Sequence, residues 1–150
     1  MLLSSRRSYM KGKLEEPSLP DNPVSLLKSW LEEIGESGFP DHNGMTLSTV
    51  DKMQRPDSRI VLLRDIKDDD LIFFTSYQSR KGFQIELNHE VLCSFYWNVF
   101  ERAIRIRGVA AKLNEDESLD YFRKRPRGSQ LAAWVSVQSS IIENRTQLEY

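Results

Sequence analysis

The spacing of hydrophobic and polar positions divides this chain into short strands and helices. A stripe of apolar residues at helical spacing predicts a helix with Asp21 or Asn22 as its N-cap and Pro23 at its first position. Because the run at 60–63 is wholly apolar, we expect a strand buried on both faces there. The charged segment 65–70 after it predicts a hairpin turn. In all, apolar and alternating runs predict strands at 45–50, 60–63, 71–75, 91–97 and 101–113.

Capping residues predict further helices between and after these strands. Ser79 suits the N-cap of a helix over about residues 80–87. Asn114, with Glu117 three positions later, is a capping-box pattern, and Pro126 ends the helix that it opens. We expect a last short helix to begin at Ser129. Short strands with helices inserted between them favour a small antiparallel barrel or an α+β sheet.

Composition narrows the class of protein. The chain has 21 basic and 22 acidic residues, and this balance gives no support for nucleic-acid binding. No apolar run approaches the ~20 residues of a membrane span, and no apolar stretch follows Arg6 and Arg7 as in a secretory signal. We therefore expect a cytoplasmic protein with no membrane partner. Cys93 lies in an apolar run and is expected to be a buried thiol, while His42 and His89 are too isolated to indicate a metal site.

Cationic side chains surround the central apolar runs and the helix start near Ser79. Arg80 and Lys81 fall in the first helical turn, where the helix dipole disfavours positive charge. A bound anion would relieve this conflict, because backbone N–H groups, a hydroxyl and two cations would converge on it. The alternative is a solvated helix start whose charges point into water, and local chemistry leaves both interpretations open.

A second polar cluster lies near the predicted helix end at Pro126. Tyr121, Arg125 and Ser129 are spaced by four residues, although Pro126 bends the path between the last two. A phenol, a guanidinium and a hydroxyl that point the same way could bind a phosphate ester. A surface cluster at a helix end is the simpler interpretation of the same residues.

Taken together, these segments resemble the pyridoxamine 5′-phosphate oxidase family. The matching motifs are Arg-x-x-Tyr at 6–9, Arg-Ile-Val-Leu-Leu-Arg at 59–64, Phe-Thr at 74–75, Ser-Arg-Lys at 79–81, Tyr-x-x-x-Arg-Pro-x-x-Ser-Gln at 121–130 and Gln-Ser at 138–139. The resemblance implies a mainly β or α+β fold over residues 23–150. This is the split β-barrel that binds flavin mononucleotide (FMN), a Greek-key antiparallel barrel with flanking helices. It also implies a homodimer with FMN at the interface.

The resemblance further implies an activity and a set of site residues. The family uses FMN to oxidise pyridoxamine or pyridoxine 5′-phosphate to pyridoxal 5′-phosphate, with O2 reduced to H2O2. No residue is assigned as a catalytic base, and residues 1–22 would be a mobile segment that can close over the substrate as a lid. By resemblance, FMN is bound by Arg59, Ile60, Val61, Leu62, Leu63, Arg64, Phe74, Thr75, Arg80, Lys81, Gln138 and Ser139. The substrate is bound by Arg6, Tyr9, Arg64, Tyr121, Arg125 and Ser129.

The sequence departs from the family pattern in three respects. Arg64 stands where Lys is usual, and Ala103 stands where a Gln contacts the flavin. The Trp-Gly-Gly, Trp-Gln-Gly and Arg-x-His-Asp-Arg segments that supply further flavin and substrate contacts do not follow Ser139. We therefore expect these 150 residues to be a poor oxidase by themselves. The alternatives are a truncated, non-catalytic family member that binds FMN or a B6 phosphate, and another split-barrel FMN-dependent reductase.

Overall fold

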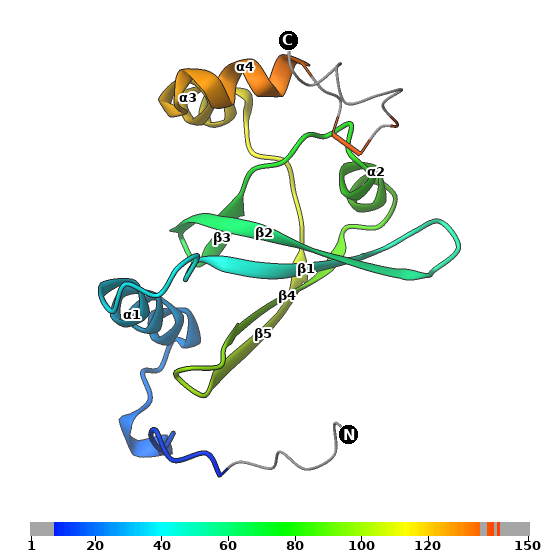
Figure 1. The fold of residues 1–150 in the computed structure, drawn as a ribbon. Coiled ribbons are helices and arrows are strands. Elements are labelled where there is room, and N and C mark those ends of the chain that lie inside the picture. The colour runs from blue at the N-terminus through cyan, green and yellow to red at the C-terminus, as the bar shows by residue number, and fades with distance from the viewer. Residues whose placement is uncertain (1–7, 136–137, 140, 142–150) are drawn as a thin grey trace, which may run out of the picture. The chain divides into compact units, whose positions relative to one another are not determined.

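The computed structural model describes residues 8–135, 138, 139 and 141, and Figure 1 shows how the chain folds. Neighbouring strands hydrogen-bond in the order β3-β2-β1-β4-β5. This five-stranded antiparallel sheet with helices confirms the predicted fold class. The elements are η1 (Glu16–Ser18), α1 (Pro23–Glu36), β1 (Gly44–Val50), β2 (Pro56–Lys67), β3 (Asp70–Phe73), α2 (Arg80–Leu87), β4 (Glu90–Trp97), β5 (Arg102–Val109), α3 (Glu115–Lys124) and α4 (Arg127–Val135).

The chain divides into two compact units, and strands contribute segments to both. The first unit contains Met1–Leu47, Arg59–Phe74 and Cys93–Ile106. The second contains Ser48–Ser58, Thr75–Leu92 and Arg107–Tyr150. Each unit therefore brings together segments that are far apart in the sequence.

The first unit holds the apolar core. Alternate residues of β1 are buried, as expected for a strand with one covered face. The rings of Phe95 and Trp97, two residues apart on β4, stack with their centroids 5.2 Å apart, and Trp97 Nε1 donates to the carbonyl oxygen of His42 at 2.8 Å. Fully burying a side chain of this size contributes about 1.5–3 kcal/mol. The buried apolar side chains are Leu27, Ile34, Met45, Leu47, Leu63, Cys93, Phe95 and Trp97.

Cys93 is buried in this core, as predicted, and burial raises the pKa of its thiol. Within the described residues, no group of three or more His, Cys, Asp or Glu side chains could hold a metal ion. None of the described helices has the length and apolar character that crossing a membrane requires.

The expectation that residues 60–63 are buried on both faces is wrong. They belong to the longer strand β2, along which exposed and less exposed residues mostly alternate. Ile60 is 67% exposed, whereas Leu63 is 5% exposed. An apolar run indicates a strand, but it does not show whether another element of the chain covers the second face.

The hairpin between β2 and β3 is tighter than the sequence indicated. Lys67 pairs with Asp70, so the turn consists of Asp68 and Asp69 rather than the whole charged segment 65–70. Both turn residues have positive φ, 49° and 71°, as both central residues of a two-residue type I′ hairpin turn do. Asn22 Nδ2 donates to Asp69 Oδ2 at 2.7 Å and links the start of α1 to this turn.

The predicted helix caps are confirmed. Asn22 Oδ1 accepts a hydrogen bond from Val24 N at 2.8 Å, and Asn114 Oδ1 accepts one from Glu117 N at 2.8 Å. Ser79 caps α2, which spans the predicted residues 80–87. These side chains satisfy backbone N–H groups that have no partner inside the helix.

Three predicted boundaries are wrong. The strand expected over 71–75 is Asp70–Phe73, so it ends before Thr75. The last helix begins at Arg127, earlier than Ser129, because the carbonyl oxygen of Pro126 accepts from Ser129 N and Gln130 N at 2.9 and 3.1 Å. Proline lacks an N–H group but keeps its carbonyl, so it can precede a helix directly. The strand expected over 101–113 is limited to Arg102–Val109.

A carboxylate holds the described part of the N-terminal segment in the first unit. Glu101 Oε2 accepts from the backbone N–H groups of Met10 and Lys11 at 2.7 and 2.9 Å. Hydrogen bonds to an ionised acceptor are roughly twice as strong as those between neutral groups. Glu101, which has a positive φ of 55°, lies directly before β5.

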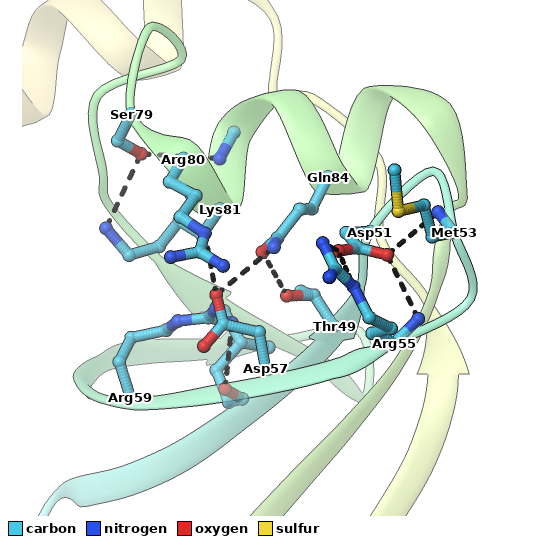
Figure 2. Close-up of polar contacts among 12 residues, drawn as sticks. Thr49, Asp51, Met53, Arg55, Asp57, Arg59, Ser79, Arg80, Lys81 and Gln84 are labelled. Atoms are coloured by element: carbon cyan, nitrogen blue, oxygen red, sulfur yellow. Dashed lines mark hydrogen bonds and ion pairs between the residues drawn. The ribbon is translucent and has the colours of Figure 1, made fainter. Parts of the chain in front are cut away.

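In the second unit, Asp51 organises the turn between β1 and β2 (Figure 2). Its Oδ1 accepts from the backbone N–H groups of Met53 and Arg55 at 2.8 and 3.0 Å. Its Oδ2 accepts from Arg55 Nε at 2.8 Å and lies 2.7 Å from Arg55 Nη2. Chiefly because of the side-chain hydrogen bond from Arg55, the pKa of Asp51 is lowered from 3.8 to about 2.

We predict that the Asp51→Asn variant loses less stability than the parent when the pH is lowered into the acidic range. The folded-state pKa lies below that of the unfolded chain, so the carboxylate stabilises the fold above about pH 4 and this contribution disappears as pH falls toward about 2. Melting temperatures measured through this range should fall less steeply for the variant than for the parent. The exposed turn residue Asp41 supplies a control, Asp41→Asn. An unchanged pH dependence in Asp51→Asn would contradict the assignment.

Candidate functional site

Lys81 places a buried positive charge at the start of α2. Its side chain is almost fully enclosed, with the residue 7% exposed. Nζ donates to Thr75 Oγ1 at 3.1 Å, to Ser79 Oγ at 3.4 Å and to Gln138 Oε1 at 3.1 Å. Thr75 Oγ1 also donates to Gln138 Oε1 at 3.1 Å. The structure thus brings together four residues of the second unit that the sequence analysis had singled out.

A compact turn delivers Ser79 to this cluster. Ser79 N and Ser79 Oγ both donate to the carbonyl oxygen of Ser76, at 3.1 and 2.6 Å. Ser79 Oγ in turn accepts from Gly82 N at 3.3 Å, which makes it the N-cap of α2. The turn therefore sets a fully buried hydroxyl beside the Lys81 ammonium and the first N–H groups of the helix.

The donors of this cluster fit a phosphate group. An ammonium, hydroxyls and backbone N–H groups at a helix N-terminus all donate hydrogen bonds to phosphate oxygens, and the helix dipole favours the negative charge. The site could therefore hold the phosphate end of a cofactor such as FMN.

Arg80 points to a different set of residues, as Figure 2 shows. Its Nε lies 3.2 Å from Asp57 Oδ2, and the same oxygen accepts from Gln84 Nε2 at 3.1 Å. Gln84 Oε1 accepts from Thr49 Oγ1 at 2.7 Å. Thr49 and Gln84 are 2% and 4% exposed, whereas the Arg80 side chain is 68% exposed. A series of hydrogen-bonded, largely buried side chains thus leads to the exposed guanidinium of Arg80.

Sequence reasoning missed the partners of Arg80. Gln84 follows Arg80 by four residues, so the two lie on one helix face, and this spacing was an available signal. Asp57 and Thr49 belong to strands that are distant in the sequence from α2. Their contact with the helix depends on tertiary packing and has no local sequence signal.

The predicted flavin residues of the first unit lie mainly on β2. Arg59 is half-buried and its Nη1 donates to the carbonyl oxygen of Leu47 at 3.1 Å. Arg64 is exposed and lies where the register with β3 shifts, between Leu63 and Asp65. Side chains alternate along a strand, so this run of residues presents its members to both faces of the sheet rather than to one.

The predicted substrate residues of the second unit come from two helices. Tyr121 lies on α3, Arg125 is its C-cap in an extended conformation, and Ser129 lies in the first turn of α4. The Arg125 guanidinium lies 5.8 Å from the centroid of the Phe122 ring. Because the helix ends before Pro126, the three residues do not share one continuous helix face.

Gln130 maintains the corner between α3 and α4. Its Nε2 donates to the carbonyl oxygens of Phe122, Arg123 and Arg125 at 3.2, 3.1 and 3.0 Å. These carbonyls lie at the end of α3, and that of Phe122 also accepts from the backbone N–H of the C-cap Arg125 at 3.2 Å. Gln130 therefore has a structural role that supports the position of Arg125.

The remaining predicted residues lie near the two ends of the chain. Tyr9 is 71% exposed, and Ser139 is exposed with a φ of 70°. Phe74 is half-buried directly after β3. Arg6 lies outside the described residues.

Comparison with known proteins identifies close relatives over nearly the whole chain. The family model described as pyridoxamine 5′-phosphate oxidase matches residues 31–150. A pyridoxine/pyridoxamine 5′-phosphate oxidase of Alteromonas mediterranea is 43% identical over 143 residues, which cover 95% of this chain and 68% of that protein. One of Cupriavidus necator is 42% identical over 148 residues, which cover 99% of this chain and 70% of that protein. The chain thus spans about two thirds of the length of these relatives.

Solved structures show the same fold. The structure of PhzG from Burkholderia lata, in complex with tetrahydrophenazine-1-carboxylic acid, has a TM-score of 0.84 and 27% identity, and the match covers 89% of this chain and 66% of that one. A pyridoxamine 5′-phosphate oxidase-related, FMN-binding protein from Nostoc punctiforme has a TM-score of 0.65 and 18% identity, with coverage of 88% and 71%. Given the match to the family model and the identity to its members, this chain belongs to the pyridoxamine 5′-phosphate oxidase family.

Proposed function

We propose that this chain binds FMN and oxidises pyridoxamine or pyridoxine 5′-phosphate to pyridoxal 5′-phosphate, with O2 reduced to H2O2. The observation that carries the proposal is the buried Lys81 ammonium among hydroxyl groups at the N-terminus of α2. This arrangement suits the phosphate of FMN. Membership of the family supports the choice of flavin and of B6 phosphates.

In the second unit, the residues bind and orient the phosphate end of the cofactor. Lys81 and Arg80 compensate its negative charge, Thr75 supplies a hydroxyl group, and the Ser79 hydroxyl oxygen holds the Lys81 ammonium. Gln138 already contacts both Thr75 and Lys81, and Ser139 follows it. FMN, when bound, supplies the hydride acceptor and the reaction with O2, so the protein's task is binding and orientation.

In the first unit, we assign the flavin contacts to residues 59–64 and Phe74. Arg59 supplies a further positive charge, and the exposed Ile60 offers an apolar contact surface. Ala103 is exposed on β5 and its methyl group can make no hydrogen bond where the family pattern has Gln. Arg64 keeps the charge of the usual Lys but presents a planar fork instead of a point charge.

For the substrate, we assign the phosphate to Tyr121, Arg125 and Ser129. A guanidinium can bind a phosphate through two parallel hydrogen bonds. We also assign Arg6, Tyr9 and Arg64 to the substrate, with the N-terminal segment as a lid over it. The contacts of Glu101 with Met10 and Lys11 provide a fixed point from which such a lid could extend.

We further propose that the chain acts as a homodimer. Large apolar side chains of the first unit are exposed, which is typical of protein interfaces when they form a patch. They include Ile60, Tyr96 and Val99, which are 67%, 66% and 48% exposed. The proposed dimer would have FMN at its interface, as in the family that the sequence resembles.

A second candidate function is binding without turnover. The observation that favours it is that Ala103 stands where the family pattern has a Gln that contacts the flavin. The contacts assigned here hold phosphate groups, and such contacts stabilise ground and transition states alike. Release of peroxide with pyridoxine 5′-phosphate distinguishes oxidation from binding alone, and nicotinamide-dependent flavin reduction would instead indicate a reductase.

We predict that Lys81→Met weakens FMN binding by about ten- to a hundred-fold, because a charge-assisted contact contributes about 1.5–3 kcal/mol. Methionine keeps most of the side-chain volume, so the fold should persist. A fluorescence titration with FMN measures the effect, and Arg59→Ala should weaken binding similarly. Lys112→Met serves as the control, since Lys112 lies in the same unit with its side chain 61% exposed. Parent-like affinity in both Lys81→Met and Arg59→Ala would refute the phosphate site.

We predict that Arg125→Ala weakens pyridoxamine 5′-phosphate binding by roughly ten-fold or more and leaves FMN affinity nearly unchanged, because only a substrate contact is removed. Titration calorimetry with each ligand measures the two affinities. Arg123→Ala is a suitable control because Arg123 is a neighbouring, exposed arginine of α3. A comparable loss of both ligands in Arg125→Ala would point to a folding defect and contradict the substrate assignment.

We predict that adding the C-terminal third of the Alteromonas mediterranea relative raises turnover by orders of magnitude. The added residues would supply contacts specific to the reacting rings, which anchoring groups do not provide. Steady-state peroxide release with pyridoxine 5′-phosphate compares the 150-residue chain with the extended chain. Ala103→Gln alone should have a much smaller effect. Equal rates from the two chains would show that the 150 residues already form a complete site.

A further inference from the structure

Asp57 has no assigned role, yet it contacts one of the proposed phosphate ligands. It lies on β2, and its Oδ2 is 3.2 Å from Arg80 Nε. Among the described residues, this carboxylate is the partner that the structure shows for Arg80. A guanidinium carries five N–H donors in a planar fork, so an ion pair made at Nε leaves the two terminal nitrogens for another ligand.

Buried groups hold the Asp57 carboxylate in place. Gln84 Nε2 donates to Asp57 Oδ2 at 3.1 Å, and Thr49 Oγ1 donates to Gln84 Oε1 at 2.7 Å. Thr49 and Gln84 are almost fully buried, so their side chains have little freedom to rearrange. Figure 2 shows this series running from β1 through α2 to Asp57 and Arg80. The carboxylate is thereby fixed relative to the first turn of α2.

Arg80 needs such a support because it is mostly exposed. Its side chain is 68% exposed, and an unrestrained arginine loses rotamer entropy when it is fixed. If the ion pair with Asp57 already orders Arg80 in the free protein, ligand binding costs less of this entropy. The opposing effect is repulsion between the Asp57 carboxylate and a phosphate, which water weakens at an exposed position.

We propose that Asp57 is a positioning residue for cofactor binding. It holds Arg80 through Nε and orients the two Nη groups toward the FMN phosphate, and Gln84 and Thr49 fix Asp57 in turn. The proposal rests on the proposed function, since it takes FMN as the ligand of α2. It adds a specific requirement, which is that a negative charge beside the site increases affinity for an anion.

The main test measures FMN and riboflavin affinity for Asp57→Asn. Riboflavin lacks the phosphate, so the variant should bind riboflavin as the parent does and FMN about three- to ten-fold more weakly. Glu86→Gln is the control, since Glu86 lies on α2, the helix that carries Arg80, and its carboxylate pairs with Lys112 instead of Arg80. Thermal unfolding at the same pH establishes that each variant is folded.

A double-mutant cycle separates positioning from a general structural role. In the Arg80→Ala background, Asp57→Asn should have no effect on FMN affinity or should increase it, because only repulsion remains. Thr49→Val should weaken FMN binding less than Asp57→Asn does. Thr49→Ser should bind FMN as the parent does, because the hydroxyl is kept.

The outcomes distinguish this inference from the proposed function. If the parent binds FMN and Asp57→Asn binds it equally or more tightly, the positioning role is overturned and the FMN site stands. If Asp57→Asn weakens FMN equally with and without Arg80, or weakens riboflavin as much as FMN, Asp57 does not act through the guanidinium. If the parent binds no FMN, the proposed function fails and this inference fails with it.

Discussion

The buried ammonium of Lys81 is the constraint around which the second unit is arranged. A charged group removed from water is strongly destabilising unless polar atoms surround it. The Ser76–Ser79 turn, the N-cap of α2 and the contacts with Thr75 and Gln138 supply those atoms. In the first unit, by contrast, stability comes from apolar side chains on α1, β1, β2 and β4.

The polar groups of the second unit form two sets with different environments. Lys81 is enclosed, and its hydrogen bonds include those to the neutral oxygens of Thr75, Ser79 and Gln138. Arg80 is exposed and pairs with a carboxylate. The two consecutive cations thus differ in exposure and partners because successive helix positions face different directions. In the proposed function, one supplies a fixed charge and the other supplies an oriented fork.

Membership of the pyridoxamine 5′-phosphate oxidase family and the contacts of α2 support the same proposal from independent observations. The family match rests on sequence over residues 31–150, whereas the cluster rests on the three-dimensional positions of side chains. The chain spans about two thirds of the length of these relatives, and the proposal assigns cofactor and phosphate binding to residues that it contains.

The sequence by itself determined the elements whose signals are local. The caps at Asn22, Ser79 and Asn114 were predictable because a short polar side chain bonds to a backbone N–H only two or three residues away. The strands near residues 45–50 and 91–97 followed from local apolar patterns. The motif residues around α2 were likewise visible, and the family resemblance that they carried is confirmed.

Only the tertiary structure decided which distant residues meet and which faces are covered. The exposure of Ile60 depends on what packs over β2, and the pairing of Asp57 with Arg80 joins a strand to a later helix. The capping of α3 by Gln130 depends on how the chain turns after Pro126. These contacts arise from packing between separate elements, and an individual stretch of sequence does not specify its distant partners.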